Sequence, residues 1–76
     1  MRNTLDQLGV GKKARIARIA GNGAIRQRLM DMGVTRGTEV RVQRRAPLGD
    51  PIQIAVKGYY LAIRSAEARF IHVECE

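Results

Sequence analysis

The carboxyl-terminal segment holds the residues best suited to chemistry. His72, Glu74, Cys75 and Glu76 are close neighbours, and alternation along a strand would put His72 and Glu74 on one face. Imidazole nitrogens and carboxylate oxygens are both ligands for transition metals. Two or three such groups do not complete a closed site, so the simpler interpretation is the polar outer face of an edge strand with a frayed tail. A transition metal would bind most easily here if two molecules shared it.

Catalytic groups are scarce in this sequence. A nucleophilic dyad or triad needs a nucleophile, a base and an orienting group, and the chain has one serine, one histidine and one cysteine in no recognisable motif. Residues 9–12 do not make a phosphate loop, because Asp6 stands where a glycine is needed and Lys13 where a hydroxyl should bind magnesium. The sequence therefore predicts a protein that is not an enzyme and requires no cofactor.

Arginine dominates the charge of the chain. The formal net charge is +7, from 14 basic and 7 acidic residues. The planar guanidinium pairs with carboxylate or phosphate, so the composition suits an acidic partner, nucleic acid or an anionic membrane surface. A basic face that only keeps a small protein in solution explains the composition equally well. Six arginines bracket one predicted helix and the strand after it: Arg26, Arg28, Arg36, Arg41, Arg44 and Arg45.

Aromatic residues are too few for a typical nucleic-acid reader. Barrels that bind single strands stack bases on aromatic platforms, whereas this chain has only Tyr59, Tyr60 and Phe70. We expect Tyr59 or Phe70 to fill part of the core. The composition therefore counts against nucleic-acid binding.

The length allows one domain, spanning residues 1–76. A chain this small buries only about 60% of the surface that its unfolded form exposes, which leaves room for a single core. No apolar run is long enough for a signal peptide or for the ~20 residues of a membrane-spanning helix. The one cysteine, Cys75, excludes an internal disulfide, so we expect a cytoplasmic protein.

One helix is predicted over residues 24–32, inside a series of strands. Asn22 or Gly23 would serve as its amino-terminal cap, and Gly33 as its left-handed stop. Its charges oppose the helix dipole, so packing must stabilise it. Its apolar residues recur at helical spacing and form one stripe: Ile25, Leu29 and Met32. Met30 lies off this stripe, and we expect it to be exposed beside Arg26, where a flexible methionine suits a partner contact.

Five strands are predicted, over residues 13–19, 39–45, 52–56, 59–64 and 70–74. Alternation fails between Ile16 and Ile19, which indicates a bulge or an early end of the strand. Gly37 and the pair Lys57-Gly58 suit turns with positive φ, and residues 65–68 suit a single helical turn capped by Ser65. Residues 5–12 are expected to form a loop into the first strand. Because closing five strands on each other removes their exposed edges, the sequence predicts a mainly β small barrel with one inserted helix.

The order of these blocks resembles the FeoA family of small bacterial ferrous iron transport accessory proteins, over nearly the whole chain. The resemblance is carried by Arg-Leu-x-x-x-Gly at residues 28–33, by Ala-Pro-Leu-Gly-Asp-Pro at residues 46–51, and by the short strands around them. Arg36 departs from the family pattern, which commonly has proline there. The resemblance implies an SH3-like barrel with an inserted helix.

The resemblance also implies a role: a cytoplasmic, non-catalytic regulator of ferrous iron uptake that acts beside FeoB, the membrane transporter with a GTP-hydrolysing portion. We expect the helix and the turn after it to dock on that cytoplasmic portion. The partner-binding residues would be Arg26, Arg28, Leu29, Met30, Gly33 and Arg36, with Leu29 and Met32 assigned first to the core. Activation or restraint of transport, and self-association, are all compatible with this role.

Two alternatives remain. One is a small module that binds Fe²⁺ or another transition metal through His72 and Glu74. The other is a metalloregulator-type module, because the same barrel resembles the carboxyl-terminal domain of diphtheria-toxin-repressor-type regulators. This sequence has no helix-turn-helix ahead of the barrel, which counts against a repressor.

Overall fold

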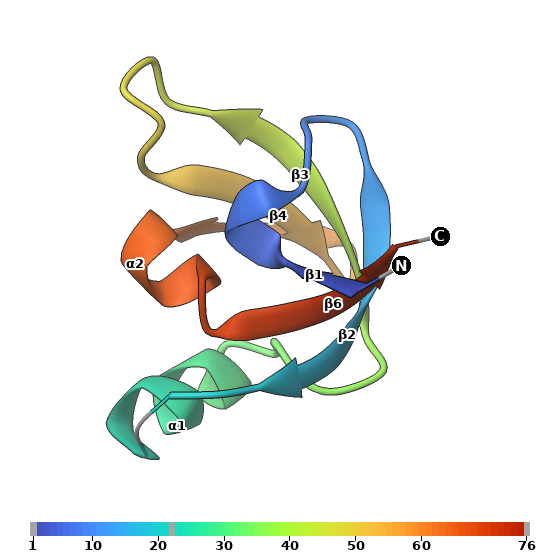
Figure 1. The fold of residues 1–76 in the computed structure, drawn as a ribbon, viewed down its shortest axis with the longest axis vertical. Helices are drawn as coiled ribbons and strands as arrows, with labels where there is room; N and C mark the ends of the chain where they lie inside the picture. The colour runs from blue at the N-terminus through green and yellow to red at the C-terminus, as the bar shows by residue number, and fades with distance from the viewer. Residues whose placement is uncertain (1, 22, 76) are drawn as a thin grey trace.

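The computed structural model describes residues 2–21 and 23–75. Within them, one antiparallel sheet has the strand order β1-β6-β2-β3-β4-β5 and curls around a single core (Figure 1). The elements in chain order are β1 (Arg2–Thr4), η1 (Leu5–Gln7), β2 (Lys13–Ile19), α1 (Gly23–Asp31), β3 (Glu39–Arg45), β4 (Ile52–Val56), β5 (Tyr59–Ile63), α2 (Ser65–Ala68) and β6 (Ile71–Cys75).

The predicted elements are all present, with small shifts. β2, β3 and β4 have the predicted bounds, β5 ends one residue early, and β6 begins one residue late. α1 begins at Gly23, one residue before the prediction, so Gly23 is the first helical residue and not the cap; Asn22 lies outside the described residues. β1 is a sixth strand that the sequence did not predict. Its three residues have no alternation to signal a strand, and pairing with β6 makes them extended.

Two bulges help the sheet to curl. The register between β2 and β6 shifts between Ile16 and Arg18, which confirms the predicted bulge. A second shift, in the pairing of β3 with β4, lies between Val42 and Arg44. Because a bulge bends its strand and increases the local twist, the sheet wraps into a small barrel.

Aliphatic side chains fill the barrel. Val40 and Val42 of β3, like the alternate residues of β4 and β6, point inward and are fully buried. The expectation that Tyr59 or Phe70 fills the core is wrong: Tyr59 is 41% exposed and Phe70 is half-buried. The space is taken by Leu5 and Leu8, which are 0% and 4% exposed.

Arg45 fixes this amino-terminal plug. Its guanidinium donates hydrogen bonds to the carbonyl oxygens of Asp6, at 2.6 Å, and Leu8, at 2.8 Å. In Figure 1, η1 lies across the barrel beside α2. Residues 5–12 were expected to form a loop, but Leu5 and Leu8 of this segment belong to the core. A barrel of short strands leaves an end that side chains must fill.

The short helix α2 is tied to the loop between β3 and β4. It begins at Ser65. The prediction that Ser65 is the cap is therefore wrong, because Ser65 is the first helical residue. The Ser65 backbone N–H donates to Oδ1 of Asp50 at 2.8 Å, and its hydroxyl donates to the carbonyl of Gly49 at 3.2 Å. The loop at residues 46–51 is thereby held against the barrel.

The carboxyl end of α1 is anchored by a Schellman motif. Gly33 has φ +91°, its N–H donates to the carbonyl of Met30 at 3.0 Å, and the N–H of Val34 donates to the carbonyl of Leu29 at 3.0 Å. Leu29 and Val34 are both fully buried in the core. The Tyr59 hydroxyl, on β5, donates to the carbonyl of Met32. The predicted glycine stop is confirmed, and a tyrosine from the sheet strengthens it.

We expect Gly33→Ala to destabilise the protein by about 2 to 4 kcal/mol, because a Cβ would be strained at this φ and would collide with the Tyr59 hydroxyl. Gly11→Ala is the matched control: Gly11 also has positive φ, but nothing lies within 4 Å of the place that its Cβ would take, so we expect a loss of about 1 kcal/mol. Urea unfolding measures both. Equal losses would show that Tyr59 does not crowd Gly33.

Candidate functional site

The helix α1 lies beyond the end of β2, apart from the sheet (Figure 1). Of its predicted apolar stripe, Leu29 is fully buried, and Ile25 and Met32 are partly buried against the core. Met30 is 41% exposed, which confirms the prediction that it lies off the stripe. Met30 is thus exposed on the outer side of α1, while the buried Leu29 holds the helix in place.

Met30 opens onto a hollow of about 250 Å³, which we call the helix hollow. Its lining comes from three separate elements: Arg26 and Met30 of α1, Arg18 and Ile19 of β2, and Arg36 of the following turn. Arg26, Met30 and Arg36 were predicted to act together, and the structure brings them together. Arg18 and Ile19 were missed by the sequence analysis. The failed alternation at Ile19 was the available signal, because the bulge between Ile16 and Arg18 changes which way the end of β2 faces.

The chemistry of the helix hollow is mixed. Met30 and Ile19 supply apolar surface, and three guanidinium groups surround it. A flexible thioether adapts to the shape of a partner's apolar side chain, and a guanidinium pairs bidentately with a carboxylate. The hollow therefore suits a protein segment in which an acidic residue stands beside an apolar one.

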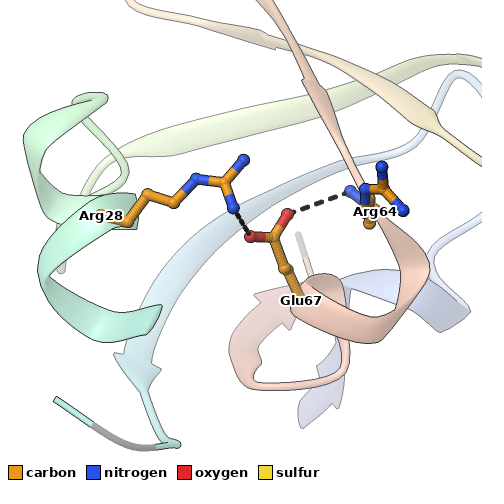
Figure 2. Close-up of polar contacts among 3 residues, drawn as sticks. All are labelled: Arg28, Arg64 and Glu67. Atoms are coloured by element: carbon orange, nitrogen blue, oxygen red, sulfur yellow. Dashed lines mark hydrogen bonds and ion pairs between the residues drawn. The ribbon is translucent and has the colours of Figure 1, made fainter. Parts of the chain in front are cut away.

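Arg28 has a different role from Arg26. Its Nη1 lies 2.7 Å from Oε2 of Glu67, which is only 8% exposed (Figure 2). The other carboxylate oxygen of Glu67 accepts a hydrogen bond from the Arg64 backbone N–H at 3.4 Å. The nearly buried carboxylate thus links α1 to α2, and we call this pair the helix clip.

Three of the six predicted partner residues therefore hold the helix and do not line the hollow. Leu29 is fully buried, so its side chain is not available to a partner in this structure. Gly33 lies under the Tyr59 hydroxyl at the end of α1, and Arg28 is in the helix clip. Arg26, Met30 and Arg36 remain as candidate contacts.

The predicted metal ligands lie on an inner strand. β6 pairs with β1 on one side and β2 on the other, so the expectation of an edge strand is wrong. His72 is half-buried opposite Arg18, and Glu74 is exposed opposite Arg15. Across residues 2–21 and 23–75, no group of three or more His, Cys, Asp or Glu side chains could hold a metal ion; Glu76 lies outside this range. Metal binding by His72 and Glu74 stays a prediction.

No helix in the described part of the chain is long and apolar enough to cross a membrane.

These features are those of a small β-barrel in which the helix α1 is inserted between β2 and β3. The FeoA domain family matches residues 3–75, which is nearly the whole chain. The chain therefore belongs to the FeoA family, as its sequence blocks predicted.

A curated relative links this family to ferrous iron transport. The Fe(2+) transport protein A/Fe(2+) transporter FeoB fusion protein of Porphyromonas gingivalis is 36% identical over 70 residues. The match covers 92% of this chain but 8% of the relative, so the chain corresponds to a small part of that protein.

Solved structures agree with the fold. A FeoA-like protein of Clostridium acetobutylicum has 36% identity and a TM-score of 0.91, over 97% of this chain and 86% of that one. FeoA of Stenotrophomonas maltophilia, described as an SH3 domain protein and solved with zinc, has 30% identity and a TM-score of 0.82, over 95% and 89% of the two chains. The predicted SH3-like barrel is confirmed.

The predicted likeness to metalloregulators is confirmed for the fold. A manganese-dependent transcriptional repressor gives a TM-score of 0.92 at 21% identity, over 99% of this chain and 37% of the repressor. At this identity the likeness concerns the fold alone.

We expect Arg28→Gln to destabilise the protein by about 1 kcal/mol, because Glu67 loses its charged partner while staying nearly buried. The value is modest because the Arg28 side chain is 63% exposed and solvent screens the pair. Arg26→Gln, on the same helix, is the control, with a change below about 0.5 kcal/mol. Urea unfolding at low and high salt measures both, and the difference should shrink in salt. Equal effects would show that the clip does not stabilise α1.

Proposed function

We propose that this chain is a non-catalytic accessory protein that docks on the cytoplasmic portion of a FeoB-type ferrous iron transporter. The fusion relative supports the partnership, because joining two domains in one chain keeps them at high effective concentration. That arrangement benefits domains that must meet. The proposed place of action is the cytoplasmic side of the membrane, where the GTPase portion of such a transporter lies.

The helix hollow is the observation that carries the proposed docking surface. Met30 is an exposed, adaptable apolar side chain with Ile19 beside it, and it can act as the central anchor of a contact. Arg18, Arg26 and Arg36 surround this anchor and would steer an acidic partner surface toward it. An apolar centre with a charged rim is the usual arrangement of a protein interface.

The helix clip and the Schellman motif would keep this surface preformed. α1 is fixed at its carboxyl end by Gly33 and Tyr59, and to α2 by Arg28. A surface that is already ordered loses less conformational freedom on binding, which favours affinity. Leu29, Gly33 and Arg28 would then act on the partner only indirectly, by positioning Met30 and Arg26.

We expect Met30→Asp to weaken binding to the transporter about tenfold or more, because it removes the anchor and places a carboxylate against an acidic partner. Leu48→Asp is the matched control, since Leu48 is 97% exposed on the loop between β3 and β4, away from α1. Surface plasmon resonance on the detergent-solubilised transporter measures both variants, with circular dichroism to confirm folding. If Met30→Asp binds like the wild type, or Leu48→Asp loses binding instead, the docking surface is wrong.

A metal-binding module is the second candidate, because the S. maltophilia relative was solved with zinc. Here His72 and Glu74 would supply two ligands, and a second molecule would supply the rest.

We expect zinc to promote a dimer of the wild-type chain and not of His72→Ala, as measured by analytical ultracentrifugation with and without chelator. Tight one-to-one binding by a monomer, lost in His72→Ala, would instead indicate a complete site within one chain.

A further inference from the structure

The outer face of the sheet carries one row of side chains in which charges are balanced. Glu39 of β3 stands opposite Arg15 of β2, which stands opposite Glu74 of β6. Opposite charges that face each other across antiparallel strands stabilise a sheet. This row therefore satisfies its own electrostatics without a ligand.

The charges of the next row are not balanced. Two residues along β2, Lys13 stands directly opposite Arg41 of β3, and like charges in this position repel. The row continues through Ala55 of β4 to Tyr60 of β5. Ala55 is small, and it lines one hollow with Arg41 and Tyr60. Tyr60 is 60% exposed, so one face of its ring is open to a ligand.

A third cation reaches the same place from the turn after β4. Lys57 has φ 49°, a left-handed conformation that is strained for lysine and that asparagine adopts more readily in such hairpins. Lys13, Arg41, Lys57 and Tyr60 all line one hollow of about 340 Å³, which we call the sheet hollow. Glu39 also lines the sheet hollow and stands opposite Arg15, so three cations and one carboxylate leave the hollow with a net positive charge that an anion would relieve.

We propose that the sheet hollow binds a free nucleotide, with phosphate groups on Lys13, Arg41 and Lys57 and the base stacked on Tyr60. Phosphate is favoured because an arginine fork and two lysine ammonium groups line the same hollow. The aromatic ring at the other end of the row favours a ligand that also has a flat ring. The row spans three strand spacings, about 14 Å, which leaves room for phosphate groups and a flat ring in one ligand.

Two other occupants fit the sheet hollow less well. Single-stranded nucleic acid needs several aromatic platforms along an extended groove, and Tyr60 is the aromatic side chain that lines this one. An acidic peptide would use the cations but would leave the Tyr60 ring without a flat partner. The proposal is independent of docking through the helix hollow, whose lining residues are all different.

The test is calorimetric titration of the purified 76-residue chain with ATP, tripolyphosphate, adenosine and an eight-residue oligothymidylate, at low and moderate salt. We expect ATP to bind with one-to-one stoichiometry, more tightly than tripolyphosphate or adenosine. Arg41→Gln should weaken ATP binding about tenfold. Tyr60→Thr, which keeps a β-branched residue on the strand, should weaken ATP binding about fivefold or more and leave tripolyphosphate binding unchanged.

Arg36→Gln is the matched control, because it removes the same charge from the helix hollow and should change ATP binding by less than about twofold. An equal loss in Arg36→Gln and Arg41→Gln would overturn the proposal, since binding would then follow net charge alone. So would tripolyphosphate binding as tightly as ATP, tighter binding of the oligonucleotide than of ATP, or no ATP binding at millimolar concentration. All these measurements use the isolated chain, so failure of transporter docking would not affect them.

Discussion

The junction between α1 and the barrel determines where the helix lies and which of its side chains are exposed. α1 has nine residues, and although Arg28 in its last turn suits the helix dipole, its first turn has no acidic side chain, so the helix would not be stable alone. Its position is set where the chain leaves it: Leu29 and Val34 enter the core on either side of Gly33, and the Tyr59 hydroxyl satisfies a carbonyl at the helix end. A helix held by its buried side and its carboxyl end can present its outer residues to a partner without disturbing the barrel.

The same junction separates residues that hold the helix from residues that can act on a partner. Leu29 and Arg28 are neighbours of Met30 in sequence, but one is buried in the core and the other is paired with Glu67. Met30 is left facing the arginines of β2 and the following turn. Six of the 14 basic residues line two hollows with different walls, one with apolar side chains at the helix and one with a tyrosine on the sheet.

The barrel itself does not decide function. Manganese-dependent repressors contain nearly the same backbone at 21% identity, within much longer chains. What distinguishes this protein is the chemistry on its surface, together with the family membership that its sequence blocks carry. A fold that places most of its core residues on short strands leaves the outer positions of those strands free to vary.

The bounds of β2, β3 and β4, the turn at Lys57-Gly58 and the exposure of Met30 could be predicted from the residues, because each depends on local periodicity or on a glycine conformation. Three features appear first in the folded molecule: residues 2–8 supply a strand and the core plug, β6 lies inside the sheet, and Arg28 pairs with Glu67. Those features depend on which distant segments meet. Strand order and the filling of a barrel end are set by packing across the whole chain, and no short pattern of residues encodes them.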